Sequence, residues 1–83
     1  MNLTWKIKTE KYVNPHIGYI GEWKCFEYFY DSFIRKDSNL IYKLKCFLPG
    51  IKDDLGNYET EKQAKEKAQS VCDYWFSKLT NKG

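Results

Sequence analysis

Hydrophobic residues in the C-terminal third of the chain recur every three or four positions, with polar residues between them. This spacing predicts one amphipathic helix over residues 60–79, and Thr60 and Gln63 have the spacing of a capping box at its start. Asn81 and Gly83 follow as stop signals. Because Trp75 has the largest apolar side chain of the helix, we expect Trp75→Ala to be the most damaging substitution. The predicted apolar face consists of Ala64, Ala68, Val71, Cys72, Trp75, Phe76 and Leu79.

Earlier in the chain the hydrophobic period changes to two, which is typical of strands. Apolar and polar residues alternate over residues 3–7 and again over residues 40–48, and residues 23–34 are rich in aromatic side chains. The polar five-residue loop Arg35–Asn39 suits a hairpin over residues 23–48 with antiparallel strands.

The remaining segments predict irregular structure. Residues 1–22 are expected to form a strand followed by an irregular turn, because Pro15 and two nearby glycines interrupt the pattern, and residues 53–57 are expected to form a loop. A chain of 83 residues suits a single domain, here residues 1–83. The predicted fold class is α+β: a three-stranded antiparallel sheet with one C-terminal amphipathic helix packed on one face.

Such a sheet has a second face that the helix leaves open. If Leu44 faces the helix, Lys43 and Lys45 point the other way, because side chains alternate along a strand. The predicted partner-binding residues on this face are Lys24, Phe26, Tyr28, Lys43, Lys45 and Phe47. Tyr30 and Ile41 are expected on the same face, with Lys6 and Lys8 on the first strand. A bulge within residues 23–34 would exchange Phe26, Tyr28 and Tyr30 for Trp23, Cys25 and Phe29.

Composition and charge leave the partner of this face open. Aromatic residues make up 18% of the chain, and 14 Lys and Arg against 11 Asp and Glu give a net charge of +3, which is mild for a dedicated nucleic-acid domain. Aromatic rings can stack bases while lysines neutralise phosphates, and the same residue types suit an acidic protein surface. In a purely structural interpretation, the aromatic residues pack internally and the lysines are solubilising.

The chain lacks the motifs that carry catalysis or hold a cofactor, such as a Gly-rich phosphate loop, a nucleophile elbow or a CxxC pair. His16 is the single histidine, and its place beside Pro15 predicts a solvated loop residue. Cys25, Cys46 and Cys72 fit three core thiols better than a zinc site with His16. We therefore expect no enzyme, no catalytic residue, no metal ion and no cofactor.

No apolar run is long enough to cross a membrane, and the first residues lack the layout of a signal peptide. Together with the odd number of cysteines, which does not fit a paired disulfide framework, this predicts a soluble protein of the host cytoplasm with no membrane contact.

Leu48-Pro49-Gly50 at a strand end, then Gly56, Thr60 and a helix with an early Ala64, resemble the HicB antitoxin domain. The same segment, over residues 42–79, resembles small uncharacterised phage and prophage proteins that share the Leu-Pro-Gly, an Ala-Lys pair and a helical Trp, here Trp75. The resemblance implies a strand-strand-strand-helix domain that binds a host protein or ribonucleoprotein complex without catalysis. It also implies occlusion of that target, as in anti-defence inhibitors of the anti-CRISPR class.

Two alternatives stay open on the sequence alone. One is a nucleic-acid-binding module that uses the aromatic and basic sheet face. The other is a HicB-like antitoxin, or a structural homodimer of unknown role. Contact of several lysines with phosphates predicts a steep loss of affinity with salt, which separates nucleic-acid binding from protein binding.

Overall fold

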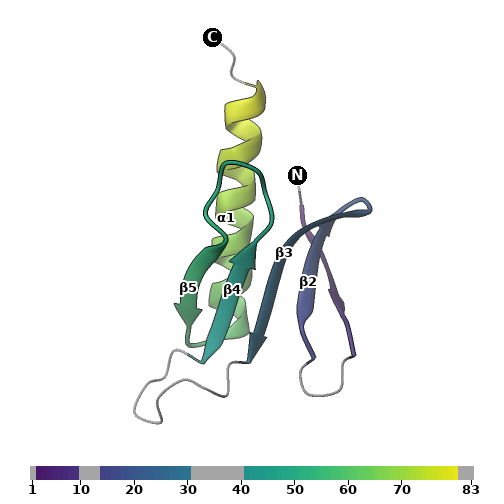
Figure 1. Cartoon of the computed structure of the whole chain (residues 1–83), viewed down its shortest axis with the longest axis vertical. Coiled ribbons are helices and arrows are strands. Elements are labelled where there is room, and N and C mark those ends of the chain that lie inside the picture. Colours follow the sequence, from purple (N-terminus) through teal and green to yellow (C-terminus); the bar gives the residue numbers. More distant parts are fainter. Residues whose placement is uncertain (1, 10–13, 31–40, 81–83) are drawn as a thin grey trace.

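The computed structural model describes residues 2–9, 14–30 and 41–80, which form an antiparallel sheet and one helix (Figure 1). The sheet has five strands, and their order in the sheet is their order along the chain. The α+β class and the C-terminal helix are confirmed, whereas the predicted number of three strands is wrong. The elements are β1 (Thr4–Ile7), β2 (His16–Ile20), β3 (Trp23–Tyr30), β4 (Tyr42–Cys46), β5 (Asp54–Tyr58) and α1 (Glu61–Thr80).

The predicted hairpin is present as the antiparallel pair β3 and β4, in which Tyr28 lies opposite Leu44. The expected connecting loop Arg35–Asn39 lies outside the described residues, as do the expected helix stop signals Asn81 and Gly83.

Strand β2 occupies the segment that was expected to be an irregular turn. It pairs with β1 on one side and with β3 on the other. A two-residue connection, Gly21 and Glu22, joins it to β3, and Gly21 has a φ of 61°, which suits a tight turn. Gly21 therefore lies in the turn of a β2–β3 hairpin, and regular structure continues on both sides of it.

Strand β5 occupies most of the segment that was expected to be a loop. It pairs antiparallel with β4, and the register between them shifts between Lys43 and Lys45. Gly56 lies within β5 with a φ of 93°, and its N–H donates a hydrogen bond of 2.9 Å to Asp54 Oδ1. The loop-like composition of β5 thus reflects an irregular edge strand.

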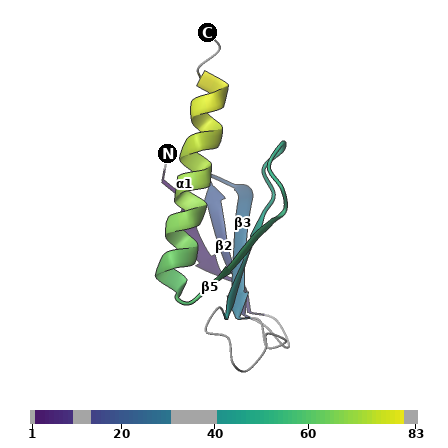
Figure 2. The same cartoon turned by 90° about the vertical axis from the view of Figure 1, so that its left-hand side faces the viewer.

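Helix α1 lies along one face of the sheet, as Figure 2 shows. Its capping is confirmed: the Gln63 N–H donates to Thr60 Oγ1 at 3.1 Å, and Gln63 Oε1 accepts from the Glu59 N–H at 3.0 Å. The first bond satisfies a backbone donor that the first helical turn leaves free, and the second ties the Gln63 side chain to the residue before the cap. The cap fixes the start of the helix beside the end of β5.

The core lies between α1 and the sheet. The small residues Ala64 and Ala68 are fully buried and let the helix approach closely. Leu79 was predicted to belong to the apolar face, yet it is 47% exposed, because it lies near the end of a helix that extends past the sheet (Figure 2). The buried core cluster is Cys25, Phe26, Tyr28, Leu44, Cys46, Leu48, Ala64, Ala68 and Cys72.

The three cysteines are free thiols, and all of them lie in this cluster, as predicted. Burial raises the pKa of each thiol. At neutral pH they therefore behave as small apolar core residues.

Candidate binding surface

The strand register determines which side chains face away from α1. Residues directly opposite each other in a sheet point to the same face. Phe26 lies opposite Cys46 and Tyr28 opposite Leu44, and all four side chains are buried on the helix side. The expectation that Phe26 and Tyr28 lie on the open face is therefore wrong, and both are 0% exposed.

A bulge in β3 causes this reversal. Gly18 lies opposite Phe26 and Tyr19 lies opposite Lys24, so Cys25 has no directly opposite residue in β2. Cys25 and Phe26 are consecutive, yet both lie in the core cluster. The extra residue interrupts the alternation, so Lys24 lies on the face away from α1 although Phe26 and Tyr28 face the helix.

The alternative register considered for residues 23–34 is right for one residue of its set. Phe29 lies on the face away from α1, opposite Lys43. Trp23, by contrast, packs against Trp75 of the helix with ring centroids 5.3 Å apart. The bulge turns Cys25 into the core, so the alternative set is not brought together either.

Four predicted residues do share the face away from α1, namely Lys24, Lys43, Lys45 and Phe47. The register places Lys6 of β1, Tyr19 of β2 and Phe29 of β3 beside them. We call this surface the open face, and it is defined by Lys6, Tyr19, Lys24, Phe29, Lys43, Lys45 and Phe47, with the carboxylates Glu27 and Asp54. Ile17 also points to this side and is buried.

Lysines and aromatic rings of the open face are paired with one another. The Lys24 ammonium lies 4.6 Å from the centroid of the Phe47 ring. The Lys6 ammonium is 5.6 Å from the Tyr19 ring, and the Lys45 ammonium is 5.8 Å from the Phe29 ring. Each such cation–π contact is worth about 0.5–1 kcal/mol at an exposed site. Three lysine–ring pairs therefore form a layer across β1 to β4.

The two carboxylates only partly offset these charges. Lys24 Nζ lies 3.8 Å from Glu27 Oε1, and Lys43 Nζ lies 3.7 Å from Asp54 Oδ2. The Gly56 N–H, and then the Lys43 ammonium, lower the pKa of Asp54, so this carboxylate stays ionised. Exposed pairs at such distances are weak and can exchange partners. Four lysines against two carboxylates leave the described part of the open face positively charged.

A second polar cluster, which the sequence interpretation missed, lies at the start of α1. His16 is not a solvated loop residue: it begins β2, and its ring stacks on Tyr28 with centroids 4.5 Å apart. His16 Nε2 lies 3.4 Å from Glu61 Oε1, and the Tyr28 hydroxyl donates to the same oxygen at 3.0 Å. Burial, and then this hydrogen bond, raises the pKa of the Tyr28 hydroxyl. Glu61, the acidic residue directly after the Thr60 cap, was the available sequence signal.

This cluster joins three elements, β2, β3 and α1, through one carboxylate. Glu61 lies in the first turn of α1, where a negative charge also interacts favourably with the helix dipole. The arrangement therefore anchors the start of α1 to the sheet. The Tyr28 hydroxyl and the Glu61 carboxylate serve this structural contact by bonding to each other.

Comparison with protein-family models, with curated proteins and with solved structures finds no match to this chain. The resemblance to HicB-like and phage proteins stays a prediction. Within residues 2–9, 14–30 and 41–80, no three His, Cys, Asp or Glu side chains are grouped so as to hold a metal ion. In the same part of the chain, no helix combines the length and hydrophobicity needed to cross a membrane.

Proposed function

We propose that this protein is a non-catalytic binding module whose open face docks on an acidic surface of a partner protein. The observation that carries the proposal is the layer of lysine–ring pairs on a sheet face that α1 leaves uncovered. Phe47 is 42% exposed and supplies an apolar anchor among the lysines. Aromatic anchors surrounded by charge are typical of protein interfaces.

The pairing of rings with ammonium groups favours an acidic protein over nucleic acid. Base stacking needs a free ring face, and Lys24 already lies over Phe47, as Lys45 does over Phe29. A partner carboxylate can bind the ammonium while the ring stays beneath it. The carboxylates Glu27 and Asp54 on the same face would also repel a phosphate backbone.

The resemblance to phage proteins implies a class of partner, namely a host protein or ribonucleoprotein complex. Docking of the open face would block the partner surface that it covers. Inhibition would then follow from occlusion, as in an anti-defence protein, with no chemical step.

Charge reversal on the open face tests the proposal. We would capture partners from nuclease-treated host lysate with the wild type, with Lys43→Glu/Lys45→Glu, and with Lys62→Glu/Lys78→Glu as a control of equal net charge. Lys62 and Lys78 lie on α1, away from the open face. A protein partner should be retained by the wild type and the control, and its recovery should fall about tenfold or more with the open-face variant.

The charge-reversed variant could unfold the sheet, because it places new carboxylates beside Glu27 and Asp54. In that case Lys43→Gln/Lys45→Gln, which removes the positive charges without reversing them, takes its place in the test. Equal recovery with the open-face variants would show that another surface binds. Loss of all recovery on nuclease treatment, with a steep dependence on salt, would assign the face to nucleic acid instead.

A further inference from the structure

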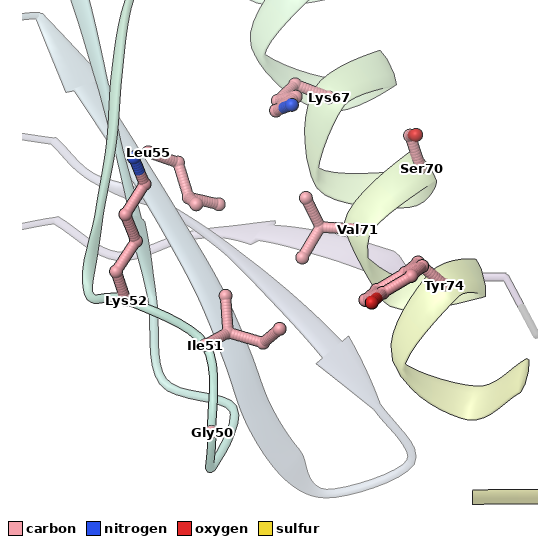
Figure 3. Close-up of a pocket in the computed structure, with 8 residues that line it drawn as sticks. All are labelled: Gly50, Ile51, Lys52, Leu55, Lys67, Ser70, Val71 and Tyr74. Atoms are coloured by element: carbon pink, nitrogen blue, oxygen red, sulfur yellow. The ribbon is translucent and has the colours of Figure 1, made fainter. Parts of the chain in front are cut away.

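A groove lies between α1 and the loop that joins β4 to β5 (Figure 3). Its volume is about 560 Å³, which is within the usual range for sites of small molecules. Figure 2 shows the β4–β5 loop leaning away from the helix at this level. The lining residues are Gly50, Ile51, Lys52 and Leu55 on one wall and Lys67, Ser70, Val71 and Tyr74 on the other.

Contacts at one end of the groove hold its two walls in place. The Trp75 indole N–H donates a hydrogen bond of 2.9 Å to the Pro49 carbonyl oxygen, which ties the loop to the helix. The Ile51 N–H donates to the Leu48 carbonyl oxygen at 3.3 Å, and Gly50 between them has a φ of 80°. The groove is therefore formed before any ligand arrives, which lowers the entropic cost of binding.

The chemistry of the two walls is apolar inside and basic at the rim. Figure 3 shows Val71 pointing from the helix toward Ile51 and Leu55 on the opposite wall. These three side chains are partly buried and pack against the core. Lys52 and Lys67 are exposed, one on each wall, and no carboxylate lines the groove.

Two further charges lie near this rim. The Lys78 ammonium is 5.4 Å from the ring of Tyr74, which lines the groove. Asp54, two residues after Lys52 in the chain, belongs to the open face, where its Oδ2 lies 3.7 Å from Lys43 Nζ. Asp53, which follows Lys52 in the chain, is not among the residues that line the groove. The charged side chains of the lining, Lys52 and Lys67, are thus both positive, and a ligand complementary to them has an apolar body and one negative group.

We infer that this groove binds a small amphipathic carboxylate, with its hydrocarbon part against Ile51, Leu55 and Val71 and its carboxylate at the rim formed by Lys52 and Lys67. The site is separate from the open face. Its binding therefore does not depend on the proposed docking function.

Octanoate is a suitable probe, and octylammonium is a control with a similar chain length and the opposite charge. We would titrate each into the ¹⁵N-labelled full chain and follow amide shifts by NMR. Octanoate should shift amides of residues 50–55 and 67–74, and octylammonium should bind at least about tenfold more weakly. Equal affinity for the two probes would overturn the inference, as would the absence of saturable shifts with octanoate.

Paired lysine variants locate the effect. Lys52→Gln/Lys67→Gln should weaken octanoate binding by about tenfold or more, because both ammonium groups of the rim are removed. Lys43→Gln/Lys45→Gln, on the open face, should leave it unchanged. The spectra of the variants report directly whether each one is folded. Octanoate binding that survives the first pair, or that is lost with the second, would contradict the assignment to the groove.

Discussion

The indole ring of Trp5 lies against Gly18, so that a Cβ atom at position 18 would stand 2.9 Å from Trp5 Cη2. The two residues are directly opposite in β1 and β2, and the missing side chain lets the ring reach Tyr28, 5.2 Å away between centroids. Gly18→Ala should displace the ring and lower the free energy of unfolding by about 1–3 kcal/mol in urea denaturation. In a Trp5→Leu background the same substitution should cost less, and an equal cost would show that the contact does not constrain position 18.

The hydrogen bond from Tyr28 to Glu61 should contribute measurably to stability. Tyr28→Phe keeps the buried ring and removes the donor, so the free energy of unfolding should fall by about 0.5–1.5 kcal/mol. Glu61→Gln alters the acceptor of the same bond. In a double-mutant cycle the combined cost should be smaller than the sum, whereas full additivity would mean that the two groups do not interact in solution.

Truncation should be more damaging at Phe26 than at Trp75. This side chain is 0% exposed and faces the helix, so Phe26→Ala should cost about 3–5 kcal/mol. Trp75 is only partly buried, and its N–H bonds to Pro49 in an exposed setting, so Trp75→Ala should cost less. This order reverses the expectation from sequence. Urea denaturation of the two variants decides it, and a larger loss for Trp75→Ala would restore the original order.

Alkaline pH should destabilise the fold through the buried thiols. Burial raises the pKa of Cys25, Cys46 and Cys72, so the folded chain keeps protons that the unfolded chain releases above about pH 8.5. Stability is then fully present below that pH and falls as pH rises toward the raised folded pKa values, by at most about 1.4 kcal/mol per pH unit for each thiol.

Urea denaturation at about pH 7 and about pH 9.5 with a reductant measures this effect. Cys72→Ala removes one of the three thiols and should show a smaller loss of stability between the two pH values than the wild type. A loss of the same size in the variant would mean that Cys72 titrates alike in the folded and unfolded chain.

The elements that could be predicted from sequence are those with local signals. Helix α1 carries a 3.6-residue period and the Thr60 cap, and β4 alternates cleanly, so Lys43, Lys45 and Phe47 were placed correctly. Strand β2 contains Gly18, which is explained only by Trp5 on the neighbouring strand, and β5 contains Gly56, which has a φ of 93°. The amino-acid composition of these two segments therefore resembles that of loops, and the sequence pattern did not predict strands there.

Only part of the candidate surface could be predicted, because the rest depends on pairing between strands. Phe26 and Tyr28 were assigned to the wrong face because one extra residue, Cys25, changes the alternation of β3, and the bulge depends on pairing with β2. The groove was not predicted at all. It depends on the bond from Trp75 to Pro49, which joins residues 26 positions apart.

The most direct test of binding by the open face is the reactivity of individual lysines in the complex with a captured partner. Brief acetylation followed by mass spectrometry compares the free and bound protein at each lysine. Lys24, Lys43 and Lys45 should become protected on binding, while Lys62 and Lys67 of α1 should react as in the free protein. Protection of the α1 lysines, with Lys43 and Lys45 still fully reactive, would contradict docking through the open face.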